Sequence, residues 1–201
     1  LCFDISGFFD HLDHSLLKGR LKSLLGVSEL PLAWHKVFRQ VTRYRRVELD
    51  DLKANSKFGE RFRSREHRLI CTMEELKSEG IPIHLNPNTY GIPQGTPISA
   101  AFANLYLIEL DRSMSAMTRE LDALYQRYSD DIILICDAKD EVAITDRFLC
   151  EIANHKLEIS HGKTERVVFD GTIGDSIQYL GFNISPDDAF IRSSSLSRQW
   201  R

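Results

Sequence analysis

The stretch Tyr128-Ser129-Asp130-Asp131 lies between two runs, residues 124–128 and 132–136, that each have the pattern of a β-strand. The sequence therefore predicts a hairpin whose tip carries two adjacent carboxylates. Such a pair is most often an ordinary solvated turn, but its oxygens also suit a hard divalent cation. A third carboxylate, Asp4, follows the apolar residues 1–3. The functional interpretation depends on whether these three carboxylates meet.

Length and composition are those of a globular protein. The 201 residues, 42% of them hydrophobic, are enough for one domain with a sizeable core. The four cysteines lack metal-ligand spacing, so we expect free thiols in a reducing compartment and a cytoplasmic location. No apolar run approaches the roughly 18 residues of a membrane span, and we expect no membrane partner.

Charge is distributed unevenly along the chain. The formal net charge of -3 gives no overall signature of nucleic-acid binding. Residues 39–68, however, contain ten Lys and Arg against five Asp and Glu. This excess favours either a surface that follows a phosphate backbone or an ordinary solvated face.

The order of expected elements is typical of the α+β class, with an antiparallel sheet backed by helices. Residues 7–10 have the composition of a turn, and residues 43–88 show no lasting period and form a candidate insertion. Strands are expected at 1–5, 124–128, 132–136, 157–159, 167–169, 177–184 and 189–192, with a turn at 186–188. Helices are expected from Asp13 or Ser15 to Gly26, and at 31–42, 72–78, 98–121 and 141–155.

Five motifs of reverse transcriptases have counterparts here, in family order. Residues 3–14, FDISGFFDHLDH, resemble motif A, and residues 91–99, GIPQGTPIS, resemble motif B. Residues 128–131 look like motif C, residues 157–164 like motif D, and residues 179–182 like motif E. The residues of motifs A and B are similar to those of the bacterial branch of the family, which includes group II intron, retron and phage-defence enzymes. The resemblance implies a polymerase palm across residues 1–201, with fingers and thumb largely missing.

The resemblance also implies a role for each motif residue. Asp4, Asp130 and Asp131 would be catalytic ligands of two Mg²⁺ ions, with Mn²⁺ as an alternative. Phe9 matches the aromatic steric gate that favours deoxynucleotides, although its spacing is equally consistent with a core position. Lys163 matches the catalytic acid of motif D, or is an ordinary surface lysine. Substrate contacts are implied for Ile5, Phe9, Gln94 and Gly95, and a primer grip for Leu180 and Gly181.

These roles imply an RNA-directed DNA polymerase that adds dNTPs to the 3′-hydroxyl of a DNA or RNA primer on an RNA template. One alternative is a template-independent or protein-primed DNA polymerase of a phage-defence (antiviral) system. Another is a non-catalytic, RNA-binding palm scaffold. A non-coding RNA or an accessory protein is a further partner consistent with the bacterial branch. Because the chain starts without Met inside an expected strand, we expect a fragment that is weak or inactive alone.

Two other polar groups resemble sites but favour simpler interpretations. His11 and His14, beside Asp10 and Asp13, imitate a metal cluster, yet their position suits a turn and a helix cap. The Asp187-Asp188 pair follows Pro186, which favours an ordinary turn.

Overall fold

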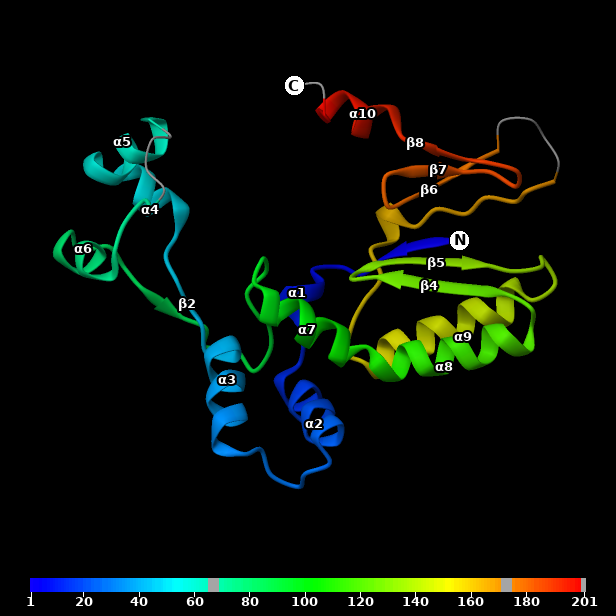
Figure 1. Ribbon diagram of the computed structural model, residues 1–201, viewed down its shortest axis with the longest axis horizontal. Helices are drawn as coiled ribbons and strands as arrows, with labels where there is room; N and C mark the ends of the chain where they lie inside the picture. The colour runs from blue at the N-terminus through cyan, green and yellow to red at the C-terminus, as the bar shows by residue number, and fades with distance from the viewer. Residues whose placement is uncertain (65–68, 171–174, 200–201) are drawn as a thin grey trace. The chain divides into compact units, whose positions relative to one another are not determined.

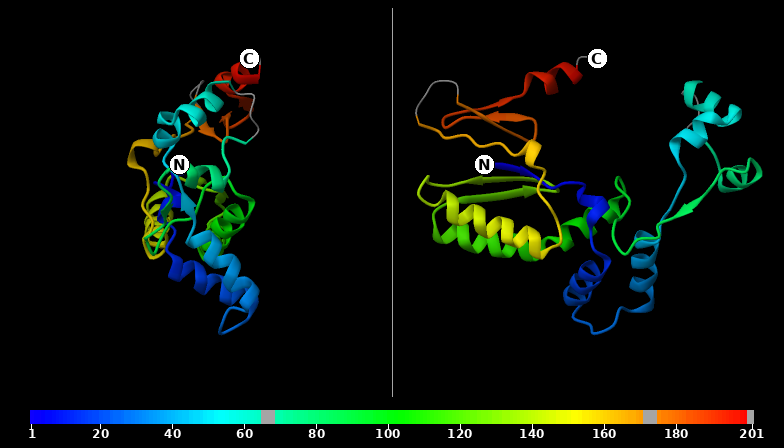
Figure 2. Two further views of the ribbon diagram at one scale, coloured as in Figure 1. Left: turned by 90° about the vertical axis from the view of Figure 1, so that its left-hand side faces the viewer. Right: turned by 180° about the vertical axis from the view of Figure 1, so that it is seen from behind.

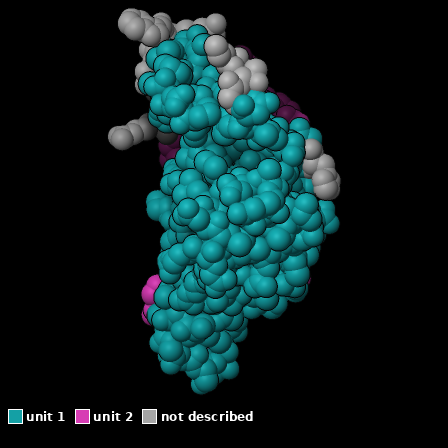
Figure 3. Space-filling model, turned by 90° about the vertical axis from the view of Figure 1, so that its right-hand side faces the viewer, with its two compact units in different colours: residues 1–29, 90–201 teal, residues 30–89 magenta. Residues whose placement is uncertain are grey.

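The computed structural model describes residues 1–64, 69–170 and 175–199 (Figure 1). The chain forms two compact units, one from residues 1–29 and 90–201 and the other from residues 30–89 (Figure 3). The predicted insertion at 43–88 falls within the second unit, and its status as an insertion stays a prediction. Within the described ranges, no helix is both long and apolar enough to cross a membrane.

A three-stranded antiparallel sheet of order β1-β5-β4 forms the centre of the first unit. Its strands are β1 (Cys2–Asp4), β4 (Leu124–Tyr128) and β5 (Asp131–Ile135), which confirms the predicted acidic hairpin. In β5 the three consecutive residues from Ile132 to Leu134 are buried. Such a run indicates that both faces of the central strand are covered.

Helices cover one face of this sheet and a second, smaller sheet faces the other (Figures 1 and 2). The helices are α8 (Ile108–Glu120) and α9 (Glu141–Asn154), and Phe148 of α9 contacts Phe3 of β1 with ring centroids 4.7 Å apart. On the opposite face, Cys2 and Ile133 pack against Ile177 and Tyr179. The predicted α+β palm architecture, a sheet backed by helices, is confirmed.

The single helix predicted at 98–121 is wrong. The chain forms α7 (Pro97–Tyr106) and then α8, with a break at Leu107, whose ψ is 8°. The break allows Leu107 to be fully buried, while the Tyr106 hydroxyl donates to the His155 carbonyl oxygen at 2.6 Å. Tertiary packing therefore overrides the local preference for one continuous helix.

The segment after β1 is held by local capping. Residues 7–10 form no simple turn, because the amides of Asp10 and His11 both donate to the Gly7 carbonyl oxygen and close a short helix, α1 (Phe8–His11). Asp13 then caps α2 (His14–Leu25), which ends at the left-handed Gly26, as predicted.

The last part of the first unit forms a meander of three strands. The strands are β6 (Ile177–Tyr179), β7 (Phe182–Ile184) and β8 (Ala189–Ile191), followed by α10 (Ser193–Gln199). The arm predicted as one strand, 177–184, is bent at Leu180-Gly181, where both residues have positive φ. Two such residues form the tight hairpin turn that matches strand twist.

The strands predicted at 157–159 and 167–169 are wrong. Within the described residues, the segment that follows α9 meets β1 and its flank only through isolated bridges, Cys2 with Glu165 and Ile5 with Ile159. Between them lies a 3₁₀ turn, His161–Lys163. This turn interrupts the ladder, so the apolar residues contribute side chains to the core without forming regular strands.

The second unit has its own small core of Leu52, Phe58 and Leu76. Its helix α6 starts with a capping box in which the Thr72 hydroxyl and the Glu75 carboxylate each accept from the other residue's amide. The helices predicted at 31–42 and 72–78 are confirmed, whereas α4 and α5 were not expected. The elements are α3 (Leu32–Thr42), β2 (Arg45–Arg46), α4 (Leu49–Ala54), α5 (Ser56–Ser64), α6 (Met73–Ser78) and β3 (His84–Leu85).

Candidate active site

Asp4 and Asp131 are brought face to face at one end of the central sheet. They are register partners across β1 and β5, although 126 residues separate them in the chain. Residues directly opposite in an antiparallel pair project to the same face with Cβ atoms about 5 Å apart. Asp130 is next to this pair, and its carbonyl oxygen accepts from the Ile5 amide at 3.3 Å. The fold therefore gathers all three predicted carboxylates at one edge.

Charge repulsion is concentrated at this edge. Desolvation raises the pKa of Asp131, and the neighbouring Asp130 and Asp4 carboxylates raise it further. Lys163 opposes this effect from the 3₁₀ turn, where its Nζ donates to Asp4 Oδ2 at 3.0 Å. The same hydrogen bond raises the pKa of Lys163. The positively charged side chain of Lys163 therefore lies beside Asp4, as expected where carboxylates crowd together.

A cleft of about 470 Å³ opens beside these residues. It is lined by Asp4 from the motif A region, Asp131 from motif C and Lys163 from motif D. Leu180 and Gly181, from the β6–β7 turn, form part of its wall. Residues from four separate predicted motifs therefore meet at one surface, where charged side chains line a cleft.

The tip of the acidic hairpin is clamped by an ion pair that the sequence did not reveal. Arg127 of β4, whose side chain is 6% exposed, donates from Nε and Nη2 to the Asp111 carboxylate at 2.8 and 2.6 Å. Its Nη1 donates to the Ser129 carbonyl oxygen at 2.9 Å. Tyr125 also donates to Asp111, at 2.7 Å. This network fixes the turn that presents Asp130.

Ser129 needs such support because its φ is 58°, a left-handed value that is unfavourable for a residue other than glycine. Nothing in the sequence pairs Arg127 with a partner on a helix sixteen residues earlier. The available signal was weak: a charged arginine inside an expected strand, which usually implies a specific partner where it is buried.

The first part of the predicted motif B forms a loop tied to α1, and its last residues begin α7. The Gly91 amide donates to the Leu12 carbonyl oxygen at 2.9 Å, and the Ile92 amide to that of Phe9 at 2.8 Å. Gln94 and Gly95 are exposed, and Gly95 has a φ of 86° with open space where a Cβ would lie. These two residues do not line the cleft beside Asp4. Their substrate contacts stay a prediction.

The remaining predicted substrate residues differ in exposure. Ile5 is 1% exposed, so its side chain belongs to the core. Phe9 is half-buried and meets the fully packed Phe8 edge-on, with centroids 5.4 Å apart. Neither residue lines the cleft. The steric-gate and core interpretations of Phe9 both stay open.

The two histidines within motif A are bonded to the backbone. His11 Nδ1 is hydrogen-bonded to the Ser6 carbonyl oxygen at 3.1 Å, and His14 Nε2 to that of Gly91 at 2.7 Å. Across the described residues, no three His, Cys, Asp or Glu side chains converge closely enough to hold a metal ion. The carboxylates at the sheet edge are therefore neighbours without a preformed three-ligand cage.

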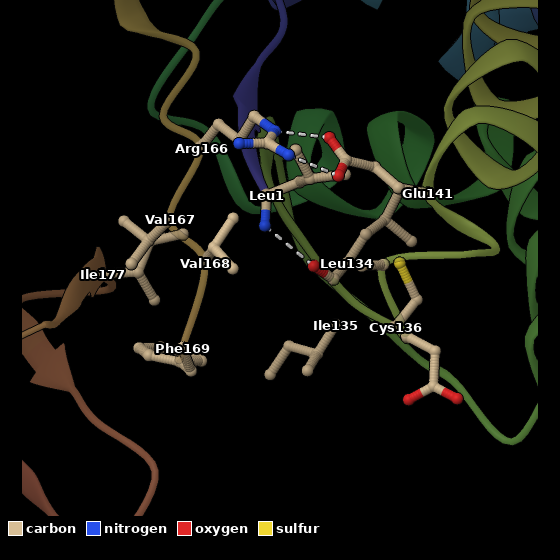
Figure 4. Close-up of a pocket in the computed structure, with 12 residues that line it drawn as sticks. Leu1, Leu134, Ile135, Cys136, Glu141, Arg166, Val167, Val168, Phe169 and Ile177 are labelled. Atoms are coloured by element: carbon tan, nitrogen blue, oxygen red, sulfur yellow. Dashed lines mark hydrogen bonds and ion pairs between the residues drawn. The ribbon is translucent and has the colours of Figure 1, made fainter. Parts of the chain in front are cut away.

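A second, smaller pocket of about 220 Å³ lies at the other end of the same sheet (Figure 4). Its lining is mainly apolar and includes Leu1, Ile135 and Val167. Arg166 forms a bidentate ion pair with Glu141 there, at 2.6 and 2.8 Å. It contains none of the predicted catalytic residues. The carboxylate end is therefore the better candidate for chemistry.

Comparison with known proteins identifies the family. Residues 1–184 match the family described as Reverse transcriptase (RNA-dependent DNA polymerase). The chain belongs to the reverse transcriptase family. A stretch of 59 residues is 32% identical to the retron Mx162 reverse transcriptase of Myxococcus xanthus, covering 29% of this chain and 12% of that protein. These matches confirm the palm of bacterial type expected from the five motifs.

Solved structures with the same fold come from telomerases. Apo telomerase of Candida tropicalis truncated from the C-terminal domain gives a TM-score of 0.65 at 14% identity, over 94% of this chain and 34% of that one. Apo telomerase of the same organism gives 0.60 at 20% identity, over 98% and 32%. Telomerase of Candida albicans, solved in complex with a fragment of telomeric RNA, gives 0.54 at 16%, over 96% and 31%. The chain thus spans about a third of these structures, and they establish its fold.

Proposed function

We propose that the chain is the palm of an RNA-directed DNA polymerase, which joins dNTPs to a primer 3′-hydroxyl on an RNA template. The observation that carries this proposal is the register pairing of Asp4 with Asp131. It puts the carboxylates of motifs A and C on one face, at the edge of a cleft. Membership of the reverse transcriptase family supports the same chemistry.

The donor set fits divalent cations. Mg²⁺ commonly takes one or two protein carboxylates together with substrate phosphates, so a complete protein cage is unnecessary. The crowding that raises the Asp131 pKa is the kind of repulsion that a cation relieves. Asp4, Asp130 and Asp131 would hold two Mg²⁺ ions, or Mn²⁺ in their place. When bound, such ions activate the attacking hydroxyl and stabilise charge on the leaving pyrophosphate.

The chain's own residues supply positioning and a proton. Lys163, whose pKa is raised beside Asp4, stays protonated at neutral pH and can donate to the leaving pyrophosphate. The Leu180-Gly181 turn in the cleft wall would hold the primer end. Arg127 keeps the Ser129 turn in place through its carbonyl contact. Phe9 would exclude a ribose 2′-hydroxyl.

The test is a pair of matched double substitutions. Asp130→Asn with Asp131→Asn removes two charges from the proposed site, while Asp187→Asn with Asp188→Asn removes two from an exposed turn of the same pattern. In RNA-templated primer extension, measured in the chain or in a longer protein containing it, the first variant should lose at least about 100-fold in rate. The second should stay close to the parent. Full synthesis by the first variant, with circular dichroism showing intact folds, would overturn the proposal.

The alternatives share this site and differ in product. A template-independent or protein-primed polymerase would make DNA whose sequence is unrelated to the supplied RNA, so sequencing products made with and without template separates it from templated synthesis. A non-catalytic RNA-binding scaffold would need no cation at Asp4. Calorimetric titration with Mn²⁺ distinguishes it, because binding that disappears in the Asp130/Asp131 variant supports the catalytic reading.

A further inference from the structure

One basic stretch stands out in the second unit because it contains no acid. Residues 30–47 have no Asp or Glu, yet five cations fall among them. The local charge is therefore strongly positive in a chain whose formal net charge is negative. All five side chains are exposed: Lys36, Arg39, Arg43, Arg45 and Arg46.

Helix geometry aligns three of these cations. Lys36, Arg39 and Arg43 follow one another at spacings of three and four residues, so they lie along one face of α3. The residues Phe38, Val41 and Thr42 are buried and define the other face of that helix. Arg45 continues the series into β2 just beyond the helix (Figure 1). Lys36, Arg39, Arg43 and Arg45 are called the α3 stripe below.

Ion pairing separates this stripe from three other basic residues of the second unit. Lys57 and Arg61 are satisfied by Glu75, at 3.1 and 2.8 Å, and Arg46 by Glu48 at 3.2 Å. The four stripe residues form no ion pair with any acid in the parts of the chain that are described. Among the described residues, Lys53 and Arg63 also form no ion pair, but each has an acidic residue in its own helix, whereas the stripe lies within residues 30–47, which contain none.

Leaving these charges unpaired has a physical cost. Like charges three and four residues apart on one helix face destabilise the helix. From Lys36 to Arg43 the stripe extends about 10 Å along α3, given a rise of about 1.5 Å per residue, and this length matches about three steps of a nucleic-acid strand. Three arginines among four residues also suit bidentate contact with phosphate oxygens.

We propose that the α3 stripe binds the sugar–phosphate backbone of RNA. The choice of RNA over DNA rests on the proposed function, because RNA is the polymer that such an enzyme must hold before any DNA has been made. The stripe itself rests only on charge and geometry within residues 30–89.

The test measures binding without catalysis, so it is independent of the polymerase assay. The probe is a fluorescent 20-nucleotide oligouridylate RNA, titrated with the full chain in the absence of nucleotides and divalent ions. The variant Arg39→Gln, Arg43→Gln, Arg45→Gln removes three stripe charges. The matched variant Arg112→Gln, Arg119→Gln, Lys139→Gln removes three exposed charges from the first unit.

Three lost phosphate contacts should reduce the slope of log affinity against log salt by about 2, at 0.7 per contact on a single strand. The plots of log affinity against log salt for the parent and the variant should converge near 1 M salt, where this electrostatic contribution vanishes. The affinity of the variant at 0.1 M salt should then be about 100-fold lower than that of the parent. In the matched variant, neither the salt slope nor the affinity at 0.1 M salt should change by more than about twofold. Circular dichroism checks that both variants fold.

Two results would overturn the inference. Equal losses in the two variants would show that binding follows total charge, with no site at the stripe. A deoxythymidylate probe of equal length that binds tenfold more tightly than the RNA would reject RNA as the ligand. If the RNA binds through the stripe but no DNA is synthesised, the proposed function fails while the binding site stands.

Discussion

The Arg127 clamp makes a sharp prediction about stability. Replacing Arg127 by Gln removes both bonds to Asp111 and the bond to the Ser129 carbonyl oxygen. The arginine side chain is 6% exposed and the aspartate 34%, so the carboxylate left behind is only partly hydrated.

Removing one partner of a buried ion pair typically costs 3–5 kcal/mol. Because water can reach part of Asp111, we expect the lower end, about 3 kcal/mol. The loss combines an unpaired carboxylate with an unsupported left-handed turn at Ser129. It should also slow catalysis, since the turn that presents Asp130 is no longer fixed.

A double-mutant cycle in urea denaturation measures the pair itself. With Arg127→Gln, Asp111→Asn and both together, the coupling free energy should be about 2 kcal/mol. The matched cycle uses Arg147 and Glu151, which meet at 2.8 Å with the arginine 54% exposed. That exposed helix pair should couple by no more than about 0.5 kcal/mol. Equal coupling in the two cycles would refute the view that burial makes Arg127 a clamp.

Three further predictions concern other residues. Hydrogen bonds from Lys156, Ser15 and the Leu16 amide outweigh burial and lower the pKa of Asp13 from 3.8 to about 2. Asp13→Asn keeps the helix cap but should lose ~1 kcal/mol at pH 7, since Lys156 is 56% exposed, and the difference in urea denaturation should shrink as the pH falls from about 5 to 1; a difference as large at pH 2 as at pH 7 would contradict this. Lys163→Gln should lower kcat about 100-fold in single-turnover extension while leaving RNA affinity unchanged, and an unaltered kcat would remove its role as proton donor. Phe9→Val should raise ribonucleotide use relative to deoxynucleotides by roughly tenfold if the ring is a gate, whereas lost stability with unchanged preference would make it a core residue.

Local signals predicted much of the fold. The acidic hairpin followed from two strand-like runs around a turn, and α2 followed from Asp13 at its start and Gly26 at its end. The failures have a common cause in tertiary structure. The helix is broken at Leu107, whose side chain is fully buried, and within the described ranges residues 157–159 pair only through the Ile5–Ile159 bridge just after β1. Neither outcome is visible in a window of local sequence.

The candidate site was predicted mainly through the resemblance to a family. Motif order indicated which carboxylates matter, but their meeting depends on Asp4 pairing with Asp131 across the sheet. The approach of Lys163 to Asp4 depends on a 3₁₀ turn in a segment that was expected only to connect two strands. The Arg127–Asp111 pair had no sequence signal beyond a charged arginine inside an expected strand. Such pairs require three-dimensional structure to be found.

Two left-handed residues other than glycine, Ser129 in the acidic hairpin and Leu180 in the cleft wall, bear on how this protein can be engineered. Each holds a positive φ, 58° and 49°, at a cost of about 1–2 kcal/mol compared with glycine in the same conformation. Leu180→Gly should therefore stabilise the fold, while removing a side chain that lines the cleft. A substitution of this kind at position 180 would therefore raise thermal stability and lower activity. Searches for a more heat-resistant variant should leave this turn unchanged and look for gains elsewhere.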